Sequence, residues 1–203
     1  MKSVATVVLL KSTGKTSGGG DAYVPGGSVR DRREYLKENR MPLLNPGDPF
    51  PQLTITTPGG QALTIPEAFA GDFAVVLFYR GSWCPYCNAQ LRAFERASQT
   101  LADNGIRVAA LSVDDEETTA ALTEKHKLTF PVGYGADAKA VTALTGAFVN
   151  PDPVYLQSTG FVLDPSGKVV VSVYSSGAIG RLVPDDVVGL VRYLREHAAT
   201  ATA

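Results

Sequence analysis

The two cysteines of the chain, Cys84 and Cys87, lie three positions apart in the segment FYRGSWCPYC. Such a pair could be a structural disulfide, part of a metal site or a reactive dithiol. A disulfide that closes so short a loop removes little conformational entropy from the unfolded chain. A structural zinc site needs four ligands, and the other strong ligands, His126 and His197, have no paired-ligand spacing. The spacing therefore favours a reactive dithiol that needs neither a metal nor another cofactor, with two inert buried cysteines as the plain alternative.

The position of the pair in the chain supports this interpretation. The preceding run FAVVLFY, residues 73–79, is continuously apolar, which is typical of a central buried strand. Pro85 suits the first position of a helix, because its missing N–H is not needed there. Cys84 then falls at the N-cap, where free backbone N–H groups and the helix dipole stabilise a thiolate. A Cys-x-x-Cys between a strand and a helix is typical of a thioredoxin-like redox site.

The position also suggests how the two cysteines divide the work. Cys87 shares a helical face with Leu91, so we expect it to be less exposed than Cys84 and to have the higher pKa. On this reasoning Cys84 attacks disulfide substrates, and either cysteine could attack a peroxide. The neighbours Trp83 and Tyr86 either pack in the core or shield the sulfur and offer a docking surface for a partner disulfide.

The elements around the pair alternate between strands and helices, as in sheets with helical crossovers. A helix is expected from Pro85 to Asp103, because apolar residues recur at helical spacing and Asn104-Gly105 can end it. The remaining strands are expected at 53–56, 61–65, 106–113 and 129–134, with a hairpin over 159–175. Further helices are expected at 66–70, 116–127 and 137–146 and after Pro184.

The whole chain has the composition of a globular protein. It has 203 residues, of which 44% are hydrophobic and 19% charged, and its net charge is −1. This balance lacks the basic surface that nucleic acid requires, and no apolar run reaches the length of a membrane span. Residues 1–40 are rich in Gly and Ser and show no apolar period, so we expect a flexible tail before a domain over 41–203. We expect a cytoplasmic protein, because the start carries no convincing signal-peptide cleavage site.

Three segments together resemble the peroxiredoxin-like family, the alkyl hydroperoxide reductase and thiol-specific antioxidant group. They are LLNPGDPFPQLTI, VVLFYRGSWCPYC and FVLDPSGKVV, and the resemblance spans roughly residues 44–197. It implies an α/β protein with a thioredoxin-like fold, in which helices flank a central mixed sheet and a peroxiredoxin-type hairpin comes first. It also implies hydroperoxide as the substrate and a thioredoxin-like or small-thiol reductant, and it allows a homodimer.

The resemblance assigns the cysteines differently from the N-cap argument. In the family motif Cys87 matches the cysteine that attacks peroxide, and Cys84 stands where the family has Thr. The sequence also departs from the family at Ser158, which occupies the place of an arginine that polarises the peroxide and favours the thiolate. Arg80 replaces the Pro of the family's Phe-Tyr-Pro, and with Arg92 it is a candidate for supplying the missing charge. We therefore expect peroxide reduction to be slower than is usual for the family.

Three hypotheses follow for the function. The first is a thiol peroxidase in which a sulfenic acid on one cysteine condenses with the other. The second is a thiol-disulfide oxidoreductase that acts on disulfides. The third is a redox-sensing binding module. Besides Cys84 and Cys87, the residues expected to bind substrate or stabilise a thiolate are Tyr79, Arg80, Trp83, Pro85, Tyr86 and Ser158.

Overall fold

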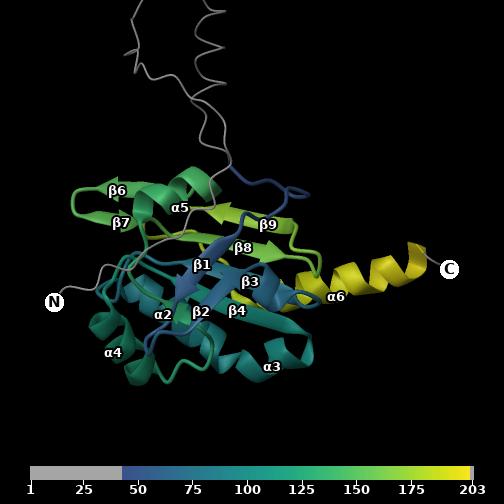
Figure 1. Cartoon of the computed structure of the whole chain (residues 1–203). Coiled ribbons are helices and arrows are strands. Elements are labelled where there is room, and N and C mark those ends of the chain that lie inside the picture. The colour runs from purple at the N-terminus through teal and green to yellow at the C-terminus, as the bar shows by residue number, and fades with distance from the viewer. Residues whose placement is uncertain (1–42, 202–203) are drawn as a thin grey trace, which may run out of the picture. The chain divides into compact units, whose positions relative to one another are not determined.

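A five-stranded sheet forms the centre of the computed structural model, which describes residues 43–201 (Figure 1). The strands lie in the order β5-β4-β3-β8-β9. β3 pairs in parallel with β4 and antiparallel with β8, while β4–β5 is parallel and β8–β9 antiparallel. Their bounds are β3 Phe73–Phe78, β4 Ile106–Leu111, β5 Val132–Gly133, β8 Thr159–Leu163 and β9 Val169–Tyr174. The mixed sheet predicted from the sequence is confirmed, and the predicted tail, 1–40, lies outside the described residues.

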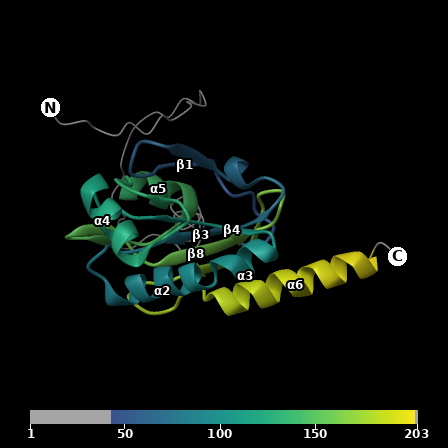
Figure 2. The ribbon, with the colours of Figure 1, turned by 90° about the horizontal axis from the view of Figure 1, so that it is seen from below.

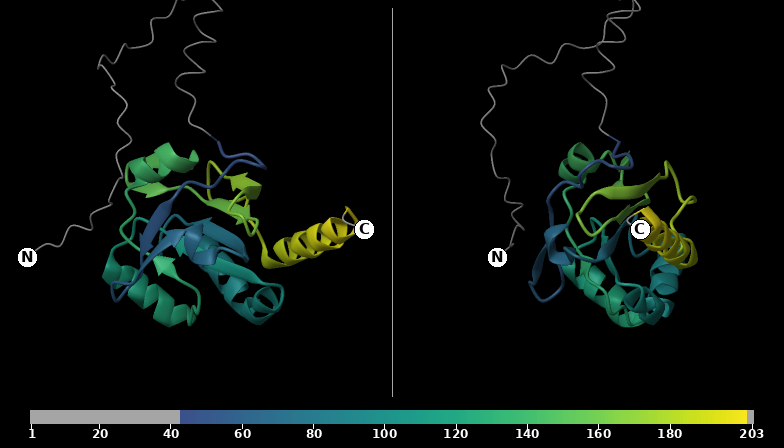
Figure 3. Two further views of the ribbon diagram at one scale, coloured as in Figure 1. Left: turned by 45° about the vertical axis from the view of Figure 1, so that its right-hand side comes forward. Right: turned by 90° about the vertical axis from the view of Figure 1, so that its right-hand side faces the viewer.

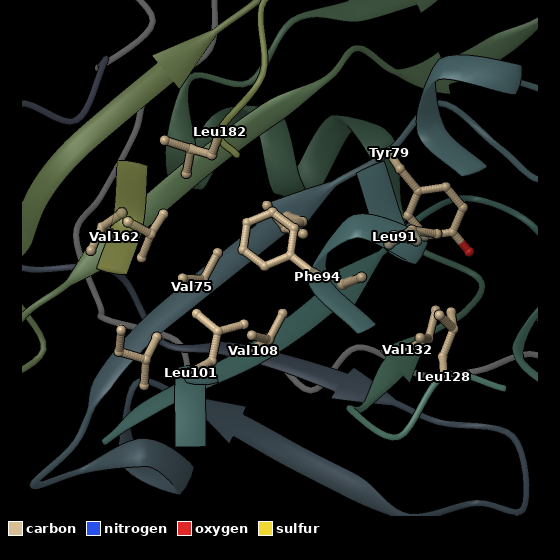
Figure 4. Close-up of a cluster of buried hydrophobic side chains, with 14 of the residues drawn as sticks. Val75, Tyr79, Leu91, Phe94, Leu101, Val108, Leu128, Val132, Val162 and Leu182 are labelled. Atoms are coloured by element: carbon tan, nitrogen blue, oxygen red, sulfur yellow. The ribbon is translucent and has the colours of Figure 1, made fainter. Parts of the chain in front are cut away.

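Four helices pack on one face of this sheet. They are α2 (Pro85–Arg96), α3 (Ser98–Asp103), α4 (Glu116–His126) and α6 (Pro184–Ala201). Val75, Leu77 and Tyr79 point to this face, because alternate residues of a strand point to opposite sides. They pack with buried residues of the helices, among them Leu91 and Phe94 of α2 (Figure 4). Figure 2 shows α2, α3 and α6 together below the sheet.

The other face of the sheet is covered by two hairpins and a helix. The antiparallel pair β1 (Leu53–Thr56) and β2 (Ala62–Ile65) leads through the short 3-10 helix η1 (Glu67–Phe69) into β3. α5 (Ala138–Thr145) and the hairpin of β6 (Val149–Pro151) and β7 (Val154–Leu156) complete the cover. Both faces of β3 are therefore buried, which explains its continuous apolar sequence. The β1–β2 pair confirms the predicted N-terminal hairpin.

Local signals fix several helix ends. The Asp115 side chain accepts the Thr118 N–H at 2.8 Å and caps α4. The Asp137 side chain caps the N-terminus of α5, and Gly146, whose φ of 75° lies in the left-handed region, caps its C-terminus. α6 starts at Pro184 and lays its apolar residues against the core, while its C-terminal part extends beyond the sheet (Figure 3).

One expectation about the elements was wrong, and one hairpin was missed. The single helix predicted over 85–103 is divided at Ala97 into α2 and α3, because the Ala97 backbone leaves helical geometry with ψ at 3°. No proline or glycine marks this point in the sequence. The hairpin β6–β7 was not predicted, because Pro151 and Pro153 argue against strands.

Candidate active site

The dithiol lies where β3 passes into α2, and the turn between them depends on a glycine. Gly81 has a φ of +150°, and a Cβ on it would lie 2.4 Å from Nε1 of Trp83. The next residue, Ser82, donates its N–H to the Asp114 carboxylate at 2.8 Å. Burial raises the pKa of Asp114, and this N–H acts in the opposite direction. The turn before Cys84 therefore depends on the backbone conformation of Gly81 and on the hydrogen bond from Ser82 to Asp114.

Cys84 is the N-cap of α2, and Pro85 is its first residue, as the sequence predicted. The Cys84 sulfur accepts the Cys87 N–H at 3.4 Å, and within residues 43–201 no other backbone N–H donates to it. Cys84 was expected to be the more exposed of the two, and this was wrong, because both cysteines are fully buried. Both are free thiols.

The Cys87 sulfur accepts hydrogen bonds from two donors, one of which it shares with Cys84. The Arg80 backbone N–H lies 3.3 Å from its sulfur, and Nη2 of Arg181 lies 3.4 Å away. The same Nη2 reaches the Cys84 sulfur at 3.8 Å, so one guanidinium nitrogen serves both thiols. Burial and the neighbouring Cys84 thiol raise the pKa of Cys87 to about 11, while the two donors act in the opposite direction. The expected increase in the pKa of Cys87 is thus present, with burial as its first cause.

Arg181 is held in this position by several acceptors. Its Nη1 donates to Ser158 Oγ at 2.7 Å and to Gln90 Oε1 at 2.9 Å, and its Nε and Nη2 donate to the Ala178 carbonyl. Gln90 is a buried residue of α2, and its Nε2 also donates to the Leu182 carbonyl at 3.0 Å. The loop between β9 and α6 is therefore tied to the helix that carries the dithiol.

This arrangement corrects the expectation about charge. Ser158 does occupy the site, but it accepts a hydrogen bond from the arginine that reaches the sulfurs. The Arg80 side chain instead donates to the Tyr155 hydroxyl at 2.7 Å and lies over the Trp83 ring, so Arg80 serves the dithiol through its backbone N–H. Arg92 lies exposed on α2. Arg181 was not predicted as a site residue, and its one signal in the sequence is that it is the only arginine between Arg107 and Arg192.

Aromatic residues surround the pair. Trp83 and Tyr86 are about half exposed, so they are not buried packing residues. The Trp83 ring packs edge-on against Tyr155 of β7 with centroids 5.1 Å apart. Tyr79, by contrast, is fully buried beneath the site, and burial raises its pKa to about 12, so its hydroxyl stays neutral.

Neither a metal cluster nor a membrane helix is found in the described part of the chain. Within residues 43–201 no three His, Cys, Asp or Glu side chains gather as metal ligands would. None of the helices in that range is both long and apolar enough to cross a bilayer. The chemistry available at the site is that of two thiols beside a guanidinium group.

Comparison with known proteins agrees with this geometry. The model of the AhpC/TSA family matches residues 46–172. A relative from Mycobacterium tuberculosis that carries a peroxiredoxin name is 30% identical over 146 residues, which are 68% of this chain and 90% of the relative. A peroxiredoxin of Treponema denticola is 29% identical over 76% of this chain and 74% of its own length.

Solved structures show the same fold. Peroxiredoxin 6 of Arenicola marina superposes with a TM-score of 0.67 at 16% identity, covering 76% of this chain and 75% of that chain. Mycobacterium tuberculosis AhpC gives a TM-score of 0.62 at 23% identity, covering 76% and 94%. The thioredoxin-like fold expected from the sequence is thereby confirmed, and the chain belongs to the AhpC/TSA family of peroxiredoxins.

Proposed function

We propose that Cys87 attacks the hydroperoxide, that Cys84 resolves the product, and that Arg181 supplies the positive charge at the reacting atoms. Thiol-dependent peroxidase activity follows from membership in the AhpC/TSA family. The observation that carries the assignment of residues is the contact of Arg181 Nη2 with both sulfurs, at 3.4 Å for Cys87 and 3.8 Å for Cys84. A guanidinium group there stabilises a thiolate and the oxyanion that leaves from the peroxide.

The proposed cycle balances as follows. The Cys87 thiolate attacks one peroxide oxygen, the O–O bond breaks, and the alkoxide or hydroxide leaves and takes up a proton. The Cys84 sulfur then attacks the Cys87 sulfenic acid, so that a disulfide forms and water leaves. A dithiol reductant returns both cysteines to thiols and becomes a disulfide itself. No bound cofactor takes part, because the cysteines carry both electrons.

Two observations favour Cys87 over Cys84 as the attacking thiol. Cys87 has the shorter contact with Arg181 and also receives the Arg80 N–H, whereas Cys84 receives one backbone N–H. Cys87 also matches the attacking position of the family motif. Burial raises the pKa of Cys87, so the thiolate is a minor form at neutral pH, and the slow peroxide reduction expected from the sequence stays a prediction.

The alternative of a thiol-disulfide oxidoreductase is less well supported, because the chain belongs to the AhpC/TSA family of peroxiredoxins. The rate constants of the reduced protein with hydrogen peroxide and with a model disulfide separate the two functions. We expect the peroxide to react faster than it does with free cysteine at the same pH. A protein that reacts rapidly with the disulfide and no faster than free cysteine with peroxide would refute the peroxidase assignment.

The setting of the reaction is part of the proposal. A dithiol that cycles through a disulfide needs a reducing pool, which supports a cytoplasmic location and a thioredoxin-like or small-thiol reductant. A homodimer remains a prediction, and sedimentation velocity of the reduced and oxidised protein measures it.

A further inference from the structure

Two side chains hold the backbone just before Cys84. The Ser82 N–H donates to the Asp114 carboxylate at 2.8 Å, and the Ser82 carbonyl accepts a hydrogen bond from Nδ2 of Asn88 at 2.8 Å. In the part of the chain that the structure describes, no other side chain forms a hydrogen bond with the backbone of residues 81–84. Both backbone polar groups of Ser82 are therefore occupied, and we call Asp114 and Asn88 the Ser82 clamp.

The Ser82 clamp connects this turn to two regular elements of the fold. Asn88 follows Cys87 in α2, and its own N–H donates to the Cys84 carbonyl at 3.1 Å. Asp114 lies just after the end of β4, where its backbone carbonyl accepts the Gly135 N–H at 2.7 Å. The turn that carries Cys84 is therefore fixed to the helix by Asn88 and to the loop after β4 by Asp114.

The two cysteines depend on this turn to different extents. Cys87 lies inside α2, and its sulfur accepts from the Arg80 N–H and from Arg181. Cys84 is the N-cap, so its position depends on the turn that precedes the helix. One nitrogen of Arg181 contacts both sulfurs, at 3.4 and 3.8 Å, which places them beside one another in the reduced protein. A disulfide needs the sulfurs about 2 Å apart, so Cys84 has only a short distance to move while the turn stays in place.

We propose that Asp114 and Asn88 are positioning residues for the step in which Cys84 attacks the Cys87 sulfenic acid. The inference rests on the proposed function, because this step follows the oxidation of Cys87 by peroxide. The S–S bond forms, the S–O bond of the sulfenic acid breaks, and hydroxide leaves with the Cys84 proton as water. A second peroxide competes for the same sulfenic acid and oxidises it to sulfinic acid. The Ser82 clamp thereby sets the ratio of disulfide to sulfinic acid.

The test measures two rates and one product ratio in the full-length protein. The reduced protein is mixed with hydrogen peroxide at increasing concentrations, quenched with an alkylating agent and analysed by mass spectrometry. Loss of the Cys87 thiol gives the rate of oxidation. The rate of disulfide formation, at peroxide concentrations where it no longer increases, gives the rate of condensation. The fraction of protein that carries sulfinic acid gives the product ratio.

The variants are Asp114→Ala and Asn88→Ala, each of which removes one hydrogen bond of the clamp. Asp114→Asn is the conservative variant, because its amide oxygen can accept the same N–H. The matched control is Glu95→Ala, because the Glu95 carboxylate also accepts a backbone N–H, that of Thr129 at 2.7 Å. Glu95 lies eight residues beyond Cys87 in α2, about 12 Å along the helix axis. Thermal melting of each variant measures the loss of stability, which the control shares.

We expect condensation to be roughly tenfold slower in Asp114→Ala, which loses a charged acceptor, and roughly threefold slower in Asn88→Ala, which loses a neutral donor. The sulfinic acid fraction at a given peroxide concentration should increase in both. The rate of Cys87 oxidation should change less than the rate of condensation, because the donors to its sulfur, Arg80 and Arg181, remain. Condensation in Asp114→Asn should be slowed less than in Asp114→Ala.

The Glu95→Ala control should match the unchanged protein in both rates and in the product ratio, whatever its melting temperature. Unchanged condensation in Asp114→Ala and Asn88→Ala would overturn the proposal, and so would equal slowing in the control. Failure of the proposed function is read separately, from the unchanged protein. There, a Cys87 thiol that peroxide does not oxidise, or sulfinic acid on Cys84 in its place, would refute the assignment of the attacking cysteine.

Discussion

Replacing Arg181 with Met should remove the charge from the site while keeping most of the side-chain volume. At an effective dielectric constant of about 20, a unit charge 3.4 Å from the Cys87 thiolate is worth about 5 kcal/mol. The net loss is smaller than this, because Arg181 is half-buried and water partly screens its charge. Removal of one preorganised group of this kind costs roughly 10²–10³ in rate. We therefore expect the rate constant for hydrogen peroxide to fall by that factor and the pKa of Cys87 to increase further.

The assay is rapid quenching with an alkylating agent, followed by mass spectrometry, over a series of pH values. Arg80→Met is the matched control, because it removes a neighbouring guanidinium that binds Tyr155 while the backbone N–H to Cys87 remains. We expect this control to lower the rate by a smaller factor than Arg181→Met does, because the Arg80 guanidinium donates to the Tyr155 hydroxyl and makes no hydrogen bond to either sulfur. Arg181→Lys keeps the charge and loses the planar fork, so an intermediate rate is expected. A larger loss in the Arg80 variant, or none in the Arg181 variant, would refute the reasoning.

Three further outcomes are expected. The peroxide rate constant should increase about tenfold per pH unit through the neutral range and level off near the pKa of Cys87, about 11; a rate constant independent of pH between 6 and 9 contradicts this. Because the pKa values of Cys87 and Tyr79 are raised in the folded state, their contribution to stability is complete below the thiol's ordinary pKa of about 9 and is lost as the pH rises towards 11 and 12. Urea unfolding at increasing pH measures this decrease in the free energy of unfolding. The Cys87→Ala variant should show a smaller decrease. A chain that begins at Met41 should retain activity and melt within the range of the full chain, whereas a loss above about 2 kcal/mol, the scale of one packed side chain, would mean that residues 1–40 contribute to the folded domain.

The sequence predicted the elements that local patterns determine. The continuous apolar run of β3 and the N-cap at Cys84 both depend on residues close together in the chain, and each is present. The break at Ala97 was missed because no proline or glycine marks it, and the hairpin β6–β7 was missed because Pro151 and Pro153 argue against strands. No residue type at Ala97 signals the change of direction.

The site was predictable only in part. The two cysteines lie three positions apart in the sequence, but Arg181 is 94 residues from Cys87, and only the folded structure brings the two together. Ser158 predicted a missing charge, because a family position shows which residue is absent but not which distant residue replaces it. The buried acceptors of Arg181, Ser158 and Gln90, become meaningful only when β8, α2 and the loop before α6 are brought together.

The central claim is that peroxide oxidises Cys87, and trapping the sulfenic acid in single-cysteine variants tests it most directly. Cys84→Thr restores the residue that the family has at this position and leaves Cys87 as the only thiol, whereas Cys87→Ser leaves only Cys84. Each reduced variant is treated with one equivalent of hydrogen peroxide in the presence of dimedone, and labelling is followed by mass spectrometry over time. The account predicts that Cys87 in the Cys84→Thr variant is labelled faster than Cys84 in the Cys87→Ser variant and faster than free cysteine at the same pH. Faster labelling of Cys84, or labelling of neither thiol above the rate of free cysteine, would contradict it.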